Sequence, residues 1–266
     1  MNIDGVEVLV EGSAPEAIVM VHGWPDTHRL WDRQVEALRA RYRCIRFTLP
    51  GFEPGQARRA YSLDQVVDVI RRVVEQTCPG EQVTLLLHDW GCVFGYQFAM
   101  RHCELVKRVI GVDVGDAGSR HHVRALGLKA KAMIFAYQGW LALAWRIGGR
   151  VGDWMARTMA RALRCPSDRT FIGSHMGYPY YLQWTGALRK AKLFTPTCPM
   201  LFIYGKRKPF MFHSSGWAEG LASRAGSQAV GFDTGHWVMI EKPEDFDQAV
   251  AAWMIAGDAA SAEIAK

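Results

Sequence analysis

One aspartate stands where a buried strand should give way to a helix, in the stretch LLLHDWGCVFGY over residues 85–96. The carboxylate of Asp89 could cap the first turn of that helix, which is a common role for aspartate. It could also be a nucleophile, because a sharp turn between a strand and a helix holds one side chain up above the sheet. A carboxylate that attacks a saturated carbon displaces a leaving group and becomes an alkyl ester, which water must then cleave.

Two further segments carry the groups that this covalent chemistry would need. The segment HGWP, residues 22–25, follows an apolar run and can offer the backbone N–H of Trp24, and the N–H of Trp90 lies one residue past the aspartate. Two N–H groups that converge on one point form an oxyanion hole, which stabilises the negative charge that develops during ester hydrolysis. The segment DTGHW, residues 233–237, follows a late apolar run, and His236 can serve as the general base that activates water.

These side chains need a scaffold that brings several strand ends together, and the hydrophobic pattern predicts one. Continuously apolar runs alternate with helical patterns, which is typical of a largely parallel sheet covered by helices on both faces. We therefore expect an α/β, doubly wound fold that binds ligands outside the carboxyl ends of its strands. A capping box, Ser62-Leu-Asp-Gln65, opens one helix. The expected strands are residues 5–10, 17–21, 42–48, 83–87, 106–112, 199–204 and 228–232, and other expected helices are 29–40, 91–102, 215–223 and 243–254.

The alternation of strands and helices stops between residues 117 and 196, where helical patterns rich in methionine and tryptophan replace it. We interpret this stretch as a helical cap inserted after the strand that ends near Asp113. The expected core then consists of residues 1–116 and 197–266, and the expected cap of residues 117–196.

The motifs His22-Gly-Trp-Pro25, His88-Asp-Trp-Gly91 and Gly235-His-Trp237 resemble those of the α/β-hydrolase superfamily, in the Asp-nucleophile branch that contains epoxide hydrolases and haloalkane dehalogenases. The resemblance covers nearly the whole chain, in the order strand, elbow, lid and late histidine. It implies an α/β-hydrolase fold, Asp89 as the nucleophile and no cofactor. The usual elbow reads G-x-S-x-G, and this chain departs from it with Leu87 in place of the first glycine.

His236 needs a carboxylate partner that fixes its tautomer, and here the chain departs from the commonest family pattern. Many members carry this acid after the strand that here ends at Tyr204, but residues 205–209 contain no acid. The basic run Lys206-Arg-Lys208 could bind an anion, and we interpret it as a solvated loop. The family's second position follows the strand after the elbow helix. Asp113 lies there, 24 residues past the nucleophile. We expect Asp113 to be the acid and keep Asp116 as the alternative.

Opening an epoxide leaves an alkoxide, and therefore a proton donor must face the nucleophile. Family epoxide hydrolases use cap residues for this purpose, usually two tyrosines. Tyr137 matches the first donor in position. The stretch GYPYYLQW, residues 177–184, offers Tyr178, Tyr180 and Tyr181 for the second. A Tyr-Tyr pair followed by tryptophan resembles the family pattern and favours Tyr181, with Tyr178 next.

The resemblance thus implies an epoxide hydrolase that forms a vicinal diol through a covalent aspartyl ester. A haloalkane or haloacid dehalogenase with the same Asp-His-acid machinery is the alternative, because His-Asp-Trp-Gly also suits that group. One dehalogenase group has asparagine where this chain has Trp24, and fluoroacetate-type enzymes have arginine where it has Trp90. A third hypothesis is a catalytically silent binding protein on the same scaffold, motivated by the missing acid after Tyr204.

Composition narrows the class of protein further. The chain has 266 residues, 49% of them hydrophobic, and a formal net charge of +6. We interpret the scattered arginines as solvated helix faces, with a basic patch for anionic substrates, a membrane surface or nucleic acid as the alternative. The six cysteines have no metal-binding spacing, and the longest uncharged apolar run, residues 132–145, is too short to span a bilayer. We expect a cytoplasmic protein without metal or cofactor, whose partners are water and a small apolar epoxide or halogenated compound. We expect no nucleic acid and no membrane partner, and leave a homodimer open.

Overall fold

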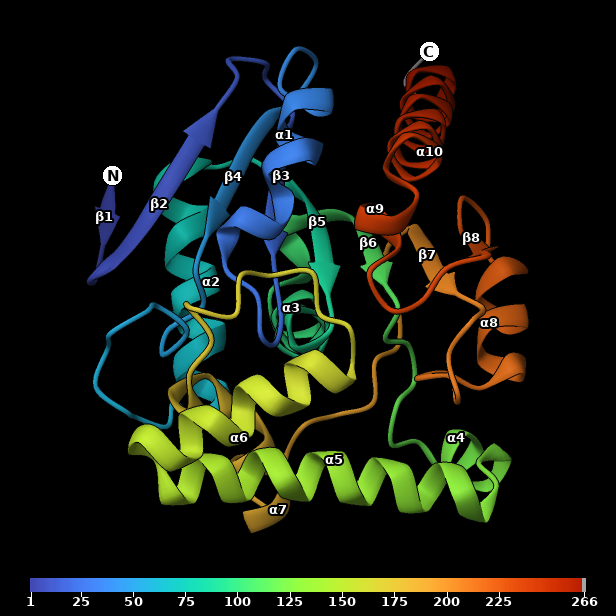
Figure 1. Ribbon diagram of the computed structural model, residues 1–266. Coiled ribbons are helices and arrows are strands. Elements are labelled where there is room, and N and C mark those ends of the chain that lie inside the picture. Colours follow the sequence, from blue (N-terminus) through green and yellow to red (C-terminus); the bar gives the residue numbers. More distant parts are fainter. Residues whose placement is uncertain (265–266) are drawn as a thin grey trace.

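The computed structural model describes residues 1–264, which fold around one eight-stranded sheet (Figure 1). Its spatial order is β1-β2-β4-β3-β5-β6-β7-β8. Every neighbouring pair from β4 to β8 is parallel, whereas β2 runs antiparallel to β4 and to β1. The mostly parallel sheet predicted from the sequence is therefore confirmed. The strands are β1 (Asn2–Ile3), β2 (Val6–Glu11), β3 (Ala17–Val21), β4 (Arg43–Phe47), β5 (Val83–His88), β6 (Val106–Val112), β7 (Met200–Gly205) and β8 (Gln228–Phe232).

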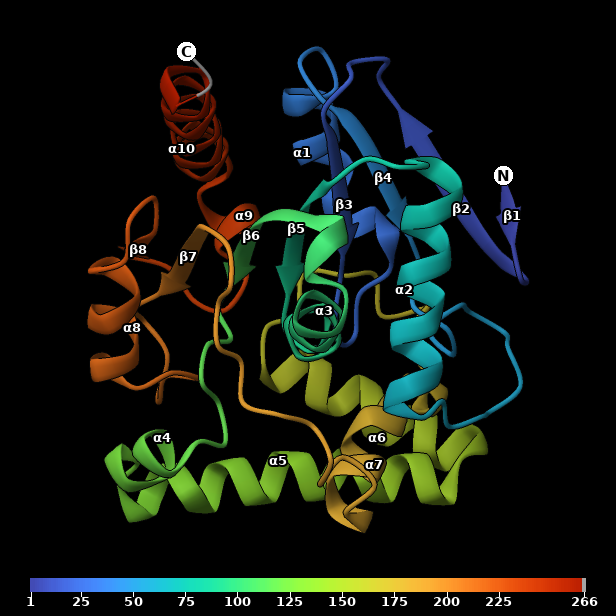
Figure 2. The same ribbon diagram turned by 180° about the vertical axis from the view of Figure 1, so that it is seen from behind.

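Helices cover both faces of the sheet and bury a separate hydrophobic cluster on each (Figures 1 and 2). The helices α2 and α3 pack on one face, where Phe94 is buried, and α1 and α10 pack on the other, where Phe246 is buried. The predicted capping box opens α2: Ser62 accepts from the Gln65 N–H, and the Gln65 side chain accepts from the Ser62 N–H. The helices that belong to the sheet-forming part of the chain are α1 (Asp32–Leu38), α2 (Leu63–Thr77), α3 (Trp90–Arg101), α8 (Ser215–Ala222), α9 (Val238–Glu241) and α10 (Pro243–Ile264).

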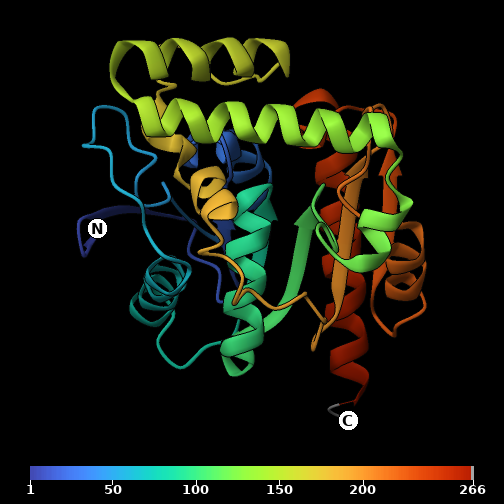
Figure 3. The same ribbon diagram turned by 90° about the horizontal axis from the view of Figure 1, so that it is seen from below.

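Between β6 and β7 the chain leaves the sheet and forms a helical segment, residues 117–196, that contains no strand. It comprises α4 (Arg120–Ala125), α5 (Leu128–Ile147), α6 (Gly149–Ala162) and α7 (Tyr178–Thr185). In the view from below, α5 crosses the end of the sheet, with α6 and α7 packed along it (Figure 3). Leu141 and Tyr178 of this segment are buried in the same cluster as α2 and α3. In the described part of the chain, no helix combines the length and apolarity needed to cross a bilayer.

Candidate active site

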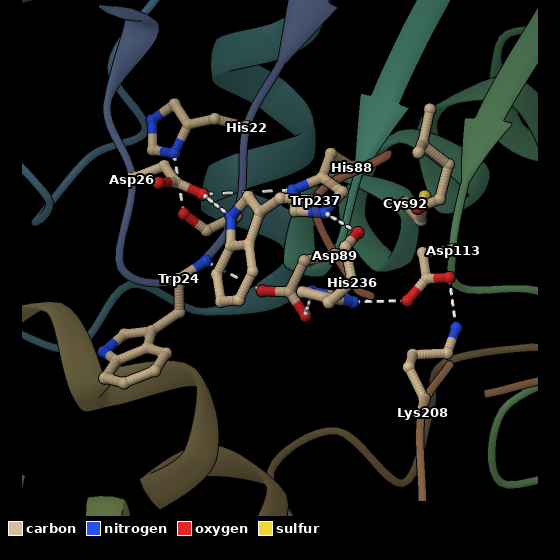
Figure 4. Close-up of polar contacts among 12 residues, drawn as sticks. His22, Trp24, Asp26, His88, Asp89, Cys92, Asp113, Lys208, His236 and Trp237 are labelled. Atoms are coloured by element: carbon tan, nitrogen blue, oxygen red, sulfur yellow. Dashed lines mark hydrogen bonds and ion pairs between the residues drawn. The ribbon is translucent and has the colours of Figure 1, made fainter. Parts of the chain in front are cut away.

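Asp89 occupies the tight turn between β5 and α3, at the carboxyl end of the sheet (Figure 4). Its backbone has φ 51° and ψ −120°, a strained conformation that costs on the order of 1–3 kcal/mol in a residue other than glycine. A Cβ at Gly91 would overlap the backbone carbonyl oxygen of Val21, and so glycine is what lets α3 start this close to β3. The Asp89 side chain makes no capping bond to α3. The turn therefore raises the Asp89 carboxylate above the sheet, and this carboxylate does not cap α3.

Two backbone N–H groups converge on this carboxylate. The N–H of Trp24 donates a hydrogen bond to Oδ2 of Asp89 over 2.8 Å, and the N–H of Trp90 is a second donor. Burial raises the pKa of Asp89, and the nearby His236 and the two N–H groups only partly offset that effect. The arrangement is the one that an oxyanion hole requires, since both donors are fixed by the backbone before any charge develops.

His236 lies after β8 and faces two carboxylates. Its Nε2 is 3.7 Å from Oδ1 of Asp89, and its Nδ1 is hydrogen-bonded to Oδ2 of Asp113. Burial lowers the pKa of His236, but the carboxylates of Asp113 and Asp89 outweigh burial and leave that pKa raised. The structure thus brings the three residues Asp89, His236 and Asp113 together, in the relative positions that nucleophile, base and acid need.

Asp113 ends β6 in a left-handed conformation, with φ 70°, and is fully buried. Besides His236 it accepts a hydrogen bond from the Gly205 N–H over 3.0 Å and pairs with the ammonium group of Lys208. The side chain of Lys208 is only 6% exposed. The prediction that residues 206–208 form a solvated loop is therefore wrong for Lys208, because its ammonium group has a buried carboxylate within reach.

Asp116, the alternative acid, does not contact His236. Its carboxylate accepts hydrogen bonds from the backbone N–H and the hydroxyl of Ser214, and from the hydroxyl of Ser119. These bonds tie the chain that follows β6 to the loop that precedes α8. Asp116 is thus placed to hold two loops together, and Asp113 is the carboxylate that reaches the imidazole.

A cavity of about 450 Å³ opens in front of Asp89, between the sheet and the helical segment. Tyr137 and Tyr180 line it together with Asp89. Tyr181 does not: its ring packs against Trp145 at 4.2 Å between centroids. The expectation that Tyr181 faces Asp89 is corrected to Tyr180. The choice depends on the rotation of α7 about its axis, since successive helical residues point about 100° apart.

The remaining tyrosine of this stretch, Tyr178, is buried between Phe52 and Tyr61 and does not line the cavity. Burial raises the pKa of both Tyr137 and Tyr180, and the nearby Asp89 charge raises it further. Both hydroxyls therefore keep their protons at neutral pH and can act as hydrogen-bond donors.

A further buried carboxylate, Asp26, lies behind the site and was not singled out from the sequence. It accepts hydrogen bonds from the indole N–H of Trp237, at 2.9 Å, and from the hydroxyl of Ser167 in the helical segment. Burial raises its pKa to about 6. The imidazole of His88 lies beside Asp26, with its Nδ1 3.9 Å from Oδ2, and its Nε2 is hydrogen-bonded to the carbonyl oxygen of His236. The sequence feature that could have pointed to Asp26 is its position directly after the HGWP motif. An aspartate in a loop is ordinarily solvated, however, and so that position did not predict a buried carboxylate.

Within residues 1–264, no group of three or more His, Cys, Asp or Glu side chains is arranged to hold a metal ion. The groups that converge at the cavity are instead a carboxylate, an imidazole with its acid, two backbone N–H groups and two phenols. Such a set can attack an electrophilic carbon, protonate a leaving oxygen and activate water.

Comparisons with known proteins agree with this picture. A model of the alpha/beta hydrolase family matches residues 18–249. "Epoxide hydrolase 2" of Caenorhabditis elegans is 32% identical over 108 residues, 39% of this chain and 30% of that protein. "Probable oxidoreductase EphD" of Mycobacterium tuberculosis is 36% identical over 104 residues, 37% of this chain and 18% of that protein. The matches thus span less than a third of these relatives' length. A Bacillus megaterium epoxide hydrolase crystallised with an inhibitor has a TM-score of 0.73 at 20% identity, covering 96% of this chain and 99% of that one.

The family model covers most of the chain, and the solved structure shares the fold from end to end. The strand-to-helix turn and the late histidine occupy the places that the motifs predicted. The resemblance drawn from the sequence is thereby confirmed, and the chain belongs to the alpha/beta hydrolase family.

Proposed function

We propose that this protein opens epoxides to vicinal diols through a covalent ester on Asp89. The observation that carries the proposal is the cavity in which Asp89 faces two buried phenols, Tyr137 and Tyr180, while His236 stands 3.7 Å from its carboxylate. Relatives named epoxide hydrolases support the same reaction class.

In the first step, an oxygen of the Asp89 carboxylate attacks one ring carbon of the epoxide. The carbon–oxygen bond breaks, and the ring oxygen leaves with the bonding electron pair. Tyr137 or Tyr180 donates its proton to that oxygen, which becomes a hydroxyl group, and a tyrosinate remains. The raised pKa of both phenols keeps the proton available until an alkoxide, a far stronger base, develops beside them.

In the second step, His236 removes a proton from water, and the water oxygen attacks the ester carbonyl carbon of Asp89. The N–H groups of Trp24 and Trp90 stabilise the oxyanion, while Asp113 stabilises the imidazolium. The intermediate then expels the diol oxygen, which takes the proton from His236. The acid proton left on Asp89 returns to the tyrosinate, and the starting state is restored.

Halide displacement would use the same carboxylate and base but needs N–H donors for the halide in place of phenols. The Trp90 indole packs edge-on against the ring of Tyr180, with ring centroids 5.2 Å apart. The Trp24 side chain is not among those that line the cavity. These contacts favour epoxide opening over dehalogenation. The experiment below measures the products of both reactions and so distinguishes them.

The test measures diol from styrene oxide and halide from chloro- and bromoalkanes. In a single turnover in heavy-oxygen water, the label enters the Asp89 side chain and appears in the diol only in a later turnover. His236→Gln should accumulate the ester, visible as added protein mass, and Asp89→Asn should lose activity by on the order of 10³-fold or more.

The phenols provide a matched comparison. The double variant Tyr137→Phe/Tyr180→Phe should lose epoxide turnover, whereas Tyr181→Phe should retain it, because only the first two line the cavity. Halide release without diol would assign the protein to dehalogenation. Full diol formation by Asp89→Asn would end the covalent mechanism.

A further inference from the structure

Charge is distributed very unevenly over this chain. Residues 117–196 contain nine arginines and four lysines but only two acidic residues, Asp153 and Asp168, and so carry a net charge of +11. The whole chain carries +6, and therefore the remainder carries −5. The basic surplus lies entirely on the helical segment that covers the carboxyl end of the sheet (Figure 3).

The same segment exposes a row of large apolar side chains along α5. Leu128 is 86% exposed, Phe135 63%, Leu143 50% and Ile147 48%. Their spacing of seven, eight and four residues places them on one face of the helix. Because α5 has 20 residues, this face is about 30 Å long. Packing between α5 and the other helices leaves it uncovered.

Helix α6 and the end of α7 extend this surface with aromatic side chains. Trp154 on α6 is 59% exposed, and Trp184 on α7 is 44% exposed and packs edge-on against Phe135, with ring centroids 4.8 Å apart. Arg150 and Arg161 are exposed and lie on the same face of α6 as Trp154, four residues before it and seven after. Exposed aromatic side chains flanked by arginines are typical of helices that lie in the headgroup layer of a membrane.

The apolar surface continues to the mouth of the cavity that contains Asp89. Val123 and Leu193 line that cavity and are also 43% and 57% exposed. Ile134 and Gln183, which line it as well, are the chain neighbours of Phe135 and Trp184. A molecule that leaves an apolar layer in contact with α5 would thus meet the opening directly.

We propose that the outer face of residues 117–196 docks on an anionic phospholipid surface, with α5 and α6 lying in the headgroup layer. The lipid phosphates and carboxylates complement the +11 charge, and the acyl boundary accommodates the exposed apolar side chains. Apolar substrate then enters the cavity from the lipid side, and this second part rests on the proposed function. This proposal departs from the expectation of no membrane partner that we drew from the sequence.

Two other occupants fit the surface less well. A second copy of the chain, docked face to face, would bring two segments of +11 charge together, and like charges oppose such contact. A nucleic acid would match the charge, but its phosphate backbone offers nothing to the apolar side chains along α5. A lipid surface is the partner that satisfies both features.

The test is sedimentation of the full chain with phosphatidylcholine vesicles, with and without about 30% phosphatidylserine, at about 50 mM and about 500 mM salt. The protein should sediment with the anionic vesicles at low salt and be released at high salt. Phe135→Ser/Trp154→Ser and Arg150→Glu/Arg161→Glu should each lower the partition coefficient by about tenfold or more.

Matched controls lie on the core. Ile255→Ser on α10, where Ile255 is 49% exposed, removes one exposed apolar side chain away from the segment, and Arg39→Glu, where Arg39 is exposed, reverses one charge away from it. Both should bind as the wild type does, and circular dichroism checks that every variant is folded. Asp89→Asn should also bind normally, so that a failure of catalysis and a failure of docking can be told apart.

Three results would overturn the proposal. These are equal sedimentation with neutral and anionic vesicles, unchanged binding by both segment variants, and a dimer in ultracentrifugation that Phe135→Ser/Trp154→Ser abolishes. The last would assign the surface to a second copy of the chain.

Discussion

At the scale of single residues, Asp113 is shared between two basic groups. Its Oδ2 binds Nδ1 of His236 and its Oδ1 binds the ammonium group of Lys208, which comes from the loop after β7. Lys208 lowers the pKa of His236, opposing the two carboxylates that raise it. The lysine therefore positions the acid and moderates the basicity of the imidazole.

Replacing Lys208 with methionine should consequently shift the pH dependence of turnover. The His236 pKa rises when the neighbouring positive charge is lost, and the imidazole must be neutral to accept a proton from water. The acidic limb of the kcat profile should therefore move to higher pH. Lys208→Arg should restore the limb, and Lys206→Met, at an exposed position of the same loop, should leave it unchanged. An unmoved limb in Lys208→Met would remove this role.

The sequence was sufficient to place Asp89, His236 and Asp113 because each comes after a strand whose apolar run is easily recognised, Asp89 and Asp113 by one residue and His236 by four. It was insufficient for Lys208 and Tyr180. A lysine in a loop is ordinarily solvated, and only the folded chain reveals a buried carboxylate within its reach. The choice between adjacent tyrosines depends on how α7 rotates against α5 and the sheet, which is set by packing and not by local pattern.

At the scale of elements, the end of β7 packs directly against the loop that carries His236. A Cβ on Gly205 would overlap the carbonyl oxygen of Gly235, and the Gly205 N–H donates to Asp113. This contact fixes the distance between the imidazole loop and the acid. Each of the seven predicted strands agrees with an observed strand to within a few residues, but the short β1 was not predicted. The last helix continues to Ile264, ten residues past its predicted end.

Gly205→Ala should accordingly displace the His236 loop. Overpacking of this kind costs about 1–3 kcal/mol of stability, and turnover should fall with it. Gly220→Ala is the matched control, because Gly220 lies on the exposed side of α8 with nothing near its Cβ position. That change should stabilise the protein by about 0.5–1 kcal/mol through helix propensity. Urea denaturation and initial rates measure both effects, and a fully stable, fully active Gly205→Ala would contradict the packing argument.

At the scale of the whole molecule, Asp26 joins three parts of the chain. It lies in the loop after β3 and accepts bonds from Ser167 of the helical segment and from Trp237, the residue after His236. The carboxylate thus couples the sheet, the helical segment and the imidazole loop through one buried group. Because its pKa is raised to about 6, the carboxylate changes charge in a pH range that enzymes commonly meet.

Ser167→Ala tests this coupling. The hydroxyl stabilises the ionised form of Asp26 and lowers its pKa, so the advantage of the wild type is complete only where Asp26 is ionised in both proteins, and it shrinks as the carboxyl group is protonated on going below pH 6. We expect a loss of about 1–3 kcal/mol at pH 8 and a smaller loss at pH 5, measured by urea denaturation. Hydrogen exchange over residues 163–171 should accelerate at pH 8. Equal losses at both pH values would show that the bond does not depend on the charge.

The order of the strands has a consequence for how the protein is made. The six strands β1 to β6 all lie within the first 112 residues and are contiguous in the sheet, whereas β7 starts only at Met200. The nascent chain can therefore build most of its sheet while the free edge of β6 stays unpaired for about 90 further residues, roughly 5–20 seconds of synthesis. During that interval Asp89 already occupies its turn while His236 has not yet been made, and the unpaired edge of β6 is the part of the sheet most open to pairing with another chain.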